Sequence, residues 1–342
     1  MMLVTLATLL AFLDLRAPGA TVCVRDVNIG FDVKIALLEL SDPLVSVFCD
    51  TAFPNGDIPK QATAATTYVK RYIKTGSDTL TVAVVSASDL ASLGVAAILL
   101  GQSDSSTYSA ATTRQVNELL NNSDFIYMVP PTLAKQGVAV KNETLIGESV
   151  KQILLYRDAL QDRSTGLWRH VVGSRTDAGS WSTGNGWALG GIAPVLATIQ
   201  HWPTSSGWTA EQQQLTSYAK EIIDGAIRIG PEGRSGLLRN YISNASTLLE
   251  AAGTAMTMVN VYRIAVLAPN VFARSQYLAW AGARRADVVK AVGPNSTLCP
   301  AINPYKYTET SPYDNTSPEA QSFAVLLYAT YRDCICAGYC KA

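Results

Sequence analysis

Apolar residues recur at helical spacing along most of this 342-residue chain. The pattern predicts helices over residues 89–101, 112–122, 144–160, 188–202, 209–229, 247–267, 272–292 and 317–336. Strand-like alternation is scarce, and its best candidate, residues 79–86, fits the start of a helix equally well. Because the predicted helices follow one another in pairs along the sequence, we expect an all-α fold of helical hairpins, arranged as a closed ring or an open solenoid. No repeat of fixed period is visible, which counts against a regular solenoid.

The segments between the predicted helices bear on domain organisation. Two of them are long, residues 161–187 and 293–316, and none has the Ser-, Pro- and Gly-rich composition of a flexible linker. A chain that is 48% hydrophobic is ample for a sizeable core, and barrels of this length often form one domain. Residues 21–342 are therefore predicted to form a single domain.

The first twenty residues indicate export. An apolar run extends from Met2 to Phe12, which is too short to span a bilayer, and the small residues Ala17, Gly19 and Ala20 follow it. This pattern predicts a signal peptide over residues 1–20, although no Lys or Arg precedes the apolar run; a buried N-terminal helix is the alternative. No later segment resembles a transmembrane helix, so no membrane association is expected.

Sequons and cysteines support export to an oxidising compartment. The five Asn-x-Ser/Thr sequons lie at Asn121, Asn142, Asn244, Asn295 and Asn315. The six cysteines lie near the two ends of the chain, at Cys23, Cys49, Cys299, Cys334, Cys336 and Cys340. They are expected to form up to three disulfides, whereas a metal site at "CICAGYC" is disfavoured because no histidine is nearby. We therefore predict a secreted, extracellular glycoprotein.

Charge and missing motifs exclude several classes of function. The 27 basic and 27 acidic residues give a formal net charge of zero, and no basic tract suggests a nucleic-acid partner. The chain lacks the Gly-x-Ser-x-Gly elbow of serine hydrolases, the Gly-Lys-Ser/Thr loop of nucleotide enzymes and the His-Glu-x-x-His pair of zinc peptidases. We expect no cofactor and no metal ion, and a monomeric protein.

Three stretches carry residues suited to catalysis or binding. In "SDFIYMVPPTLAKQGV", Asp124 precedes Phe125, Tyr127 and Met128. Apolar neighbours disfavour ionisation, so this carboxyl group could keep its proton and act as a general acid. Alternatively, Asp124 caps the helix that follows it, which is common for aspartate.

The second stretch, residues 156–174, contains a turn at 164–166 followed by Trp168, Arg169 and His170. A loop histidine beside an aromatic ring and a cation is a reasonable substrate contact. We predict that all three residues contact substrate, with Arg169 as partner of a substrate carboxylate. The alternative for His170 is a surface position with a local hydrogen bond.

The third stretch is "WSTGNGWALGG", residues 181–191. Its Gly-Asn-Gly sequence, centred on Asn185, can adopt left-handed backbone angles, and a helix is predicted to begin near Trp187. The free N–H groups of that helix would favour an anion such as a carboxylate. Trp181 and Trp187 are expected either to present their rings to a sugar or to pack a hairpin into the core.

Together these stretches resemble glycoside hydrolase family 88/105, and most closely its secreted, fungal-type six-hairpin branch. The motifs that carry the resemblance are "DFIYMVPPTLA", "TGLWRH", "WSTGNGW" and "LEAAGTAMTMVNVYRIA", in the family's order, between about residues 89 and 332. The resemblance implies an (α/α)6 barrel of six helical hairpins. It also implies hydrolysis of oligosaccharides that carry a 4,5-unsaturated uronic acid, as left by a polysaccharide lyase.

The resemblance also implies roles for individual residues. Asp124 matches the catalytic acid/base and Asp89 an upstream aspartate that assists it. His170 matches a substrate-contacting histidine, and Trp181 and Trp187, with the turn between them, match the aromatic wall of the pocket. The expected chemistry protonates the double bond at C4 and adds water at C5, after which the hemiketal collapses.

Two rival functions stay open at this point. A conventional glycosidase on the same barrel would need a second carboxylate, for which Asp89 and Asp177 are candidates. A non-catalytic glycan-binding protein is the other, because the segment between Leu120 and Asp124 is shorter than in the resembled family. That difference would truncate one hairpin and its share of the pocket wall.

Overall fold

The computed structural model describes residues 69–81, 91, 93–121, 126–173, 176–202, 205–230, 236–293, 297–303, 306, 311–313 and 317–341. The predicted signal peptide, the sequons at Asn295 and Asn315 and both predicted catalytic aspartates, Asp89 and Asp124, lie outside these ranges.

The described chain is all-α, as the periodicity predicts. Its helices are α6 (Gly94–Ser103), α7 (Ser105–Asn121), α8 (Val129–Ala139), α9 (Glu143–Leu160), α10 (Ser182–His201), the 3-10 helix η2 (Ser205–Trp208), α11 (Thr209–Ile229), α12 (Ala251–Leu267), α13 (Pro269–Phe272), α14 (Ser275–Lys290) and α15 (Pro318–Cys336). Extended backbone in the described ranges pairs only in isolated bridges. Residues 79–81 of the strand candidate form a bend. None of the described helices combines the length and the hydropathy needed to cross a bilayer.

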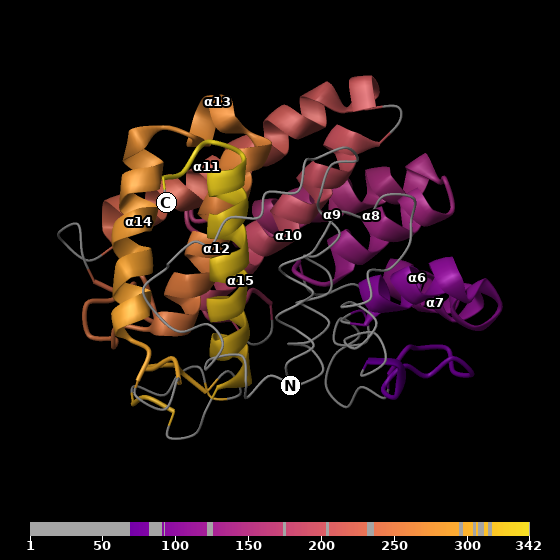
Figure 1. Cartoon of the computed structure of the whole chain (residues 1–342), viewed down its shortest axis with the longest axis horizontal. Coiled ribbons are helices and arrows are strands. Elements are labelled where there is room, and N and C mark those ends of the chain that lie inside the picture. The colour runs from indigo at the N-terminus through magenta and orange to yellow at the C-terminus, as the bar shows by residue number, and fades with distance from the viewer. Residues whose placement is uncertain are drawn as a thin grey trace. The chain divides into compact units, whose positions relative to one another are not determined.

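The chain forms two compact units, and α9, α10 and α11 each have residues in both. In the first unit, which includes residues 69–154 and 194–212, α6 packs against α7 and α8 (Figure 1). Helix α6 is apolar around its whole circumference and is buried from Gly94 to Gly101. Its first residue, Gly94, lies so close to Thr132 of α8 that a side chain at this position would collide with the threonine.

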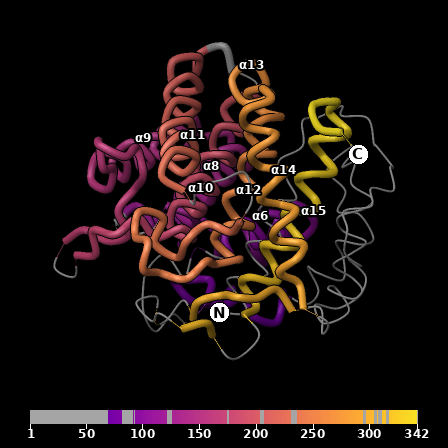
Figure 2. The backbone as a smooth tube through the Cα atoms, turned by 90° about the vertical axis from the view of Figure 1, so that its left-hand side faces the viewer, coloured from indigo at the N-terminus to yellow at the C-terminus, as the bar shows by residue number. Residues whose placement is uncertain are grey.

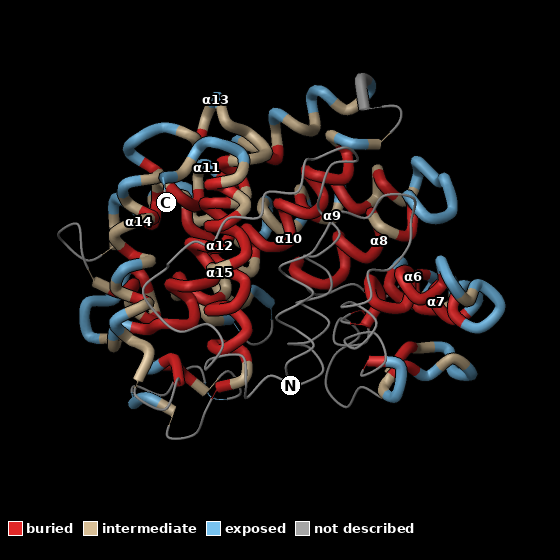
Figure 3. The backbone as a smooth tube through the Cα atoms, in the orientation of Figure 1, coloured by how far each residue is buried: buried red, intermediate tan, exposed pale blue. Residues whose placement is uncertain are grey.

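In the second unit, which includes residues 155–193 and 213–341, α12 is the central helix. It packs against α13, α14 and α15, and both backbone views show α12, α14 and α15 side by side (Figures 1 and 2). Nearly every residue of α12 is buried (Figure 3). Its sequence begins with Ala-Ala-Gly-Thr-Ala, and these small side chains allow the neighbouring backbone to approach closely.

Helix α10 differs from the prediction, because it begins at Ser182 rather than near Trp187. The Gly-Asn-Gly sequence is therefore part of the helix, and neither Gly184 nor Gly186 has a positive φ. The glycines serve packing instead: a Cβ atom on Gly186 would lie 2.9 Å from Met256 Cγ of α12. The predicted left-handed turn at this position was wrong.

Four of the six cysteines lie within the described residues, whereas Cys23 and Cys49 lie outside them. Cys334 and Cys340 are bonded to one another, and Cys336 is also in a disulfide. Cys299 is exposed and free.

Candidate active site

A pair of antiparallel segments between α9 and α10 carries the predicted histidine. His170 N–H donates to Gly179 O at 2.9 Å, and Val171 and Asp177 exchange two backbone hydrogen bonds, of 3.0 and 2.9 Å. Gly166 makes the preceding turn with φ of 76°, in the left-handed region where a side chain is strained. This local pairing places the side chains of His170 and Asp177 beside one another.

Asn185, in the first turn of α10, links the segment that carries Trp168 to the helix through hydrogen bonds. Asn185 Oδ1 accepts a hydrogen bond from Trp168 N–H at 2.9 Å, and its Nδ2 donates to Trp168 O at 2.9 Å and to Trp181 O at 3.0 Å. Both amide protons are thus used, and the residue is only 2% exposed. Asn185, for which a substrate contact is predicted, is buried and uses both amide protons to position the loop, so its side chain has no donor left for a sugar.

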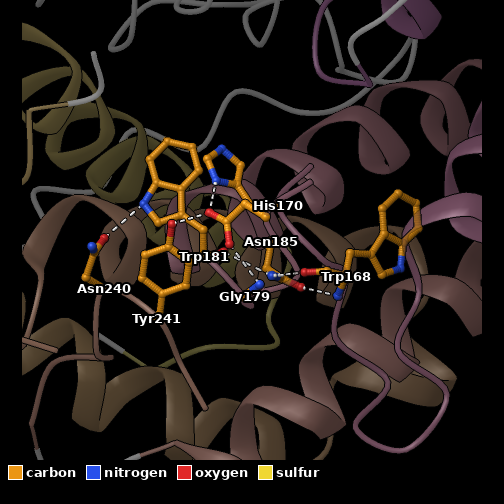
Figure 4. Close-up of polar contacts among 8 residues, drawn as sticks. Trp168, His170, Gly179, Trp181, Asn185, Asn240 and Tyr241 are labelled. Atoms are coloured by element: carbon orange, nitrogen blue, oxygen red, sulfur yellow. Dashed lines mark hydrogen bonds and ion pairs between the residues drawn. The ribbon is translucent and has the colours of Figure 1, made fainter. Parts of the chain in front are cut away.

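The polar centre of the site consists of Asp177 and the two side chains bonded to it, His170 and Tyr241, which are labelled in Figure 4. Asp177 Oδ2 lies 3.0 Å from His170 Nδ1 and accepts a hydrogen bond from Tyr241 Oη at 2.5 Å. Asp177 Oδ1 accepts one from Gly179 N–H at 3.0 Å. His170 is partly shielded, with 13% of its side chain exposed, and Asp177 is more open, at 24%.

The surroundings set the charge of both groups. Burial lowers the pKa of His170, and the nearby Asp177 offsets this only in part, so the imidazole is mostly neutral at pH 7. Burial alone would raise the pKa of Asp177. The hydrogen bonds from Tyr241, Gly179 and His170 outweigh burial and bring that pKa below its ordinary value. Asp177 is therefore an ionised carboxylate beside a neutral imidazole.

An aromatic group adjoins this polar centre. The ring centroids of His170 and Trp181 are 4.5 Å apart, and those of Trp181 and Trp187 are 6.1 Å apart. Trp181 is buried, and its Nε1–H donates to Asn240 Oδ1 at 2.9 Å. Trp187 is half-buried. Trp181 thus supports the imidazole from within the core, and of these two tryptophans Trp187 is the more open to a ligand.

The remaining two predicted contacts lie apart from this cluster. Trp168 is 2% exposed, and its ring points away from Trp181 (Figure 4). The Trp168 side chain, for which a substrate contact is predicted, is therefore buried in the core. Arg169 lies on the same extended segment, and it is exposed to solvent. Hydrogen bonds from Ser164 and, to a smaller extent, the charge of Arg169 hold the pKa of Asp162 below its ordinary value.

Sequence reasoning assigned no role to Glu250, which the structure places at the start of α12. Its carboxyl group is fully buried and accepts hydrogen bonds from the N–H groups of Ala252, Gly253 and Ile302. Burial nevertheless raises its pKa to about 7. Burial and the proximity of Glu250 raise the pKa of Glu319, in the first turn of α15, to about 8. The only sequence signal was the position of Glu250 directly before the small residues of "AAGTA".

Among the described residues, no group of three or more His, Cys, Asp and Glu side chains is arranged so that it could hold a metal ion. The three residues at the polar centre bond to one another instead. Asp89 and Asp124 cannot be placed relative to His170, because they lie outside the described residues.

The sequence model of Glycosyl Hydrolase Family 88 matches residues 60–265, which is more than half of the chain. The chain therefore belongs to this family and is a glycoside hydrolase. The sequence matches none of the curated proteins.

Three solved structures are similar in fold. A family 105 glycoside hydrolase from C. acetobutylicum ATCC 824 is 13% identical over 96% of this chain and 99% of that chain, with a TM-score of 0.65. A family 88 glycosyl hydrolase from Bacteroides vulgatus is 13% identical over 97% of each chain, with a TM-score of 0.64. An unsaturated glucuronyl hydrolase from Bacillus sp. GL1 is 15% identical over 97% of this chain and 94% of that chain, with a TM-score of 0.57. These likenesses confirm the predicted fold class, the (α/α)6 barrel.

Proposed function

We propose that this glycoside hydrolase acts on oligosaccharides ending in a 4,5-unsaturated uronic acid and releases that sugar by hydrating its C4=C5 bond. The observation that carries the proposal is the placement of a neutral, half-shielded His170 between an ionised Asp177 and the indole ring of Trp181. Such a group suits a contact with a sugar hydroxyl. One protein of the same fold is an unsaturated glucuronyl hydrolase.

The proposed mechanism needs a single carboxyl group that acts first as acid and then as base. Asp124 is proposed to give its proton to C4 and to take one from the water that attacks C5, with Asp89 assisting. The hemiketal formed at C5 then collapses and frees the sugar on the reducing side. Arg169 is exposed on the loop that carries His170, and it is proposed to pair with the carboxylate of the uronide.

The two-carboxylate mechanism of conventional glycosidases has less support. Of its candidate second groups, Asp177 accepts three hydrogen bonds that hold it ionised, so it is poorly suited to donate a proton. Glu250 has a raised pKa, but both of its oxygens cap the backbone of α12 and neighbouring Ile302. Neither group is free to act on a glycosidic bond.

Export is a further part of the proposal. The leader, the sequons and the disulfides together favour a secreted glycoprotein. Asn142 and Asn244, the two sequon asparagines whose exposure the structure gives, are both exposed to solvent, as a glycan requires.

The decisive test is loss of ultraviolet absorbance from lyase-generated unsaturated oligosaccharides. We expect the wild-type protein to abolish this absorbance and Asp124→Asn to reduce the rate at least about a hundredfold, because the variant has no proton to give. Asp158→Asn is the matched control, since Asp158 lies on α9 with 71% of its side chain exposed, and it should behave as wild type.

Other results would overturn the assignment. Unchanged turnover by Asp124→Asn would remove Asp124 from the chemistry. Cleavage of saturated, intact linkages would indicate a conventional glycosidase. Binding of the oligosaccharide without any loss of absorbance would indicate a glycan-binding protein.

A further inference from the structure

The segment before α12 resembles the segment before α10. Residues 166–169 read Gly-Leu-Trp-Arg, and residues 236–239 read Gly-Leu-Leu-Arg. The two glycines have φ of 76° and 112°. In each segment the N–H group before the arginine donates to the side chain of the fourth residue of the following helix, at 2.9 Å to Asn185 and at 2.8 Å to Thr254. The two arginines therefore stand at equivalent positions in two consecutive helix pairs.

Arg239, the second of these arginines, lies on the middle one of three extended segments. Its segment pairs with residues 247–249 along one edge and with residues 180–182 along the other. Asn240 is 2% exposed, so Arg239 and Tyr241 project to the opposite side of the segment, where both are partly exposed. Tyr241 belongs to the polar centre of the site (Figure 4), and successive residues on one side of a strand lie about 7 Å apart. The arginine is thus held on a fixed segment beside the site.

One edge of the Arg239 guanidinium has no protein partner. Nη1 donates to Thr247 O at 3.0 Å, whereas Nε and Nη2, which form the other edge, bond to nothing in the described part of the chain. Arg157 shows what this edge can hold, because its Nε and Nη2 both donate to the carboxylate of Glu221, each at 3.0 Å. A carboxylate held in this way gains two parallel, charge-assisted hydrogen bonds. Arg239 therefore presents a preformed edge for a carboxylate that the described chain does not supply.

We propose that Arg239 binds the carboxylate of the second sugar of the substrate, the one that follows the unsaturated uronide, and so makes the enzyme prefer a uronic acid at that position. The place of this sugar rests on the proposed function, in which Arg169 is assigned to the carboxylate of the terminal uronide. The binding of a carboxylate by Arg239 rests on its unpartnered edge alone. Arg239 is then a residue that determines specificity, and it takes no part in the hydration step.

Two unsaturated disaccharides test the proposal, one with glucuronic acid and one with glucose as the second sugar. Arg239→Gln should lower kcat/KM about 10- to 100-fold for the acidic disaccharide, chiefly through KM, because a charge-assisted pair is lost. The value for the neutral disaccharide should stay nearly the same. Arg239→Lys keeps the charge without the two-donor edge and should restore only part of the loss. Equal losses on both sugars, as expected if Arg239 only holds Thr247 in place, would overturn the proposal.

Two other arginines serve as comparisons. Arg169→Gln should lower turnover of both disaccharides by a similar factor, because both carry the terminal carboxylate. Arg274 is exposed and also donates to a backbone carbonyl, that of Asn270, so Arg274→Gln is the matched control and should change neither value. A loss confined to the acidic disaccharide in Arg274→Gln would show that the preference is not a property of Arg239, and would overturn the proposal.

Binding without turnover separates this inference from the proposed function. A saturated disaccharide of two glucuronic acids has no C4=C5 bond to hydrate, and calorimetric titration measures its affinity. We expect Arg239→Gln to weaken this binding about tenfold or more. No difference between wild type and variant would overturn the inference, even if unsaturated sugars are turned over. The expected difference, without turnover of any unsaturated uronide, would overturn the proposed function and leave Arg239 as a carboxylate-binding residue.

Discussion

At the scale of single residues, two buried carboxyl groups link acidity to stability. Glu250 and Glu319 lie at the starts of α12 and α15, helices that pack against one another. The folded protein raises the pKa of Glu250 to about 7 and that of Glu319 to about 8, chiefly through burial. In the unfolded chain both groups titrate near 4.5. Between pH 4.5 and about 8, the folded state therefore binds more protons than the unfolded state.

The free energy of unfolding should therefore fall as the pH rises from about 5 to about 8. We expect Glu319→Gln to make this dependence on pH weaker and to stabilise the protein at pH 8 by on the order of 1–3 kcal/mol relative to wild type. The reason is that a glutamine side chain is uncharged at every pH, whereas glutamate must take up a proton to be buried in the neutral form. Urea unfolding at several pH values measures the effect.

Glu148 provides the control for this experiment. It pairs with Lys151 on the surface of α9, and Glu148→Gln should leave the pH slope as it is. Parallel slopes for wild type and Glu319→Gln would show that Glu319 does not titrate in this range.

At the scale of helices, the close contact of α12 with the start of α10 depends on a glycine. A Cβ atom on Gly253 would collide with Ser182 Oγ and lie 2.6 Å from Thr183 N. Because the nearby atom of Thr183 is backbone, the contact cannot relax cheaply. We expect Gly253→Ala to destabilise the protein by about 2 kcal/mol or more in urea unfolding.

The matched substitution is Gly282→Ala on α14. Nothing lies within 4 Å of a Cβ atom built at Gly282, so an alanine there gains helix propensity without a clash. It should stabilise the protein by about 0.5–1 kcal/mol. Effects of the same sign for the two substitutions would contradict the packing argument.

The helix boundaries also show how much of the secondary structure could be predicted from the sequence. Helix α11 has the predicted bounds, and α15 differs by one residue at its start, because their apolar positions follow the helical period and turn or cap residues precede them. The start of α10 was missed, since Gly184 and Gly186 have low helix propensity and suggested a turn. Contacts with α12 and the bonds of Asn185 override that propensity, and neither is visible in a local window of sequence.

The candidate site was predicted in part for a similar reason. His170, Trp181 and Trp187 come together as expected, because they lie close in the sequence around one loop. Asp177 appeared only as a possible second carboxylate, and Tyr241 did not appear at all. Tyr241 is 64 residues from Asp177, and only the fold brings the two together.

At the scale of the whole molecule, the cysteines give a test of the folded chain. Cys299 is free and exposed, whereas Cys334, Cys336 and Cys340 are in disulfides. We expect an alkylating reagent to label Cys299 in the native, non-reduced protein, and to label the other three only after reduction. Peptide mass mapping measures the labels, and Cys299→Ser should lose the native one.

A disulfide found at Cys299 in the purified protein would contradict this pattern. It would also return the cysteines to the three bonds that their even number allows. Labelling of Cys334 or Cys340 without reduction would contradict the bond between them.

The paired segments that carry His170 have a consequence for remodelling the protein. The hydrogen bonds between Val171 and Asp177 close the loop below its tip, and Val172, Gly173 and Thr176 at the tip are exposed. The chain could therefore be lengthened at the tip without disturbing the imidazole or its carboxylate partner. A dye or an additional binding loop grafted there would lie beside the site.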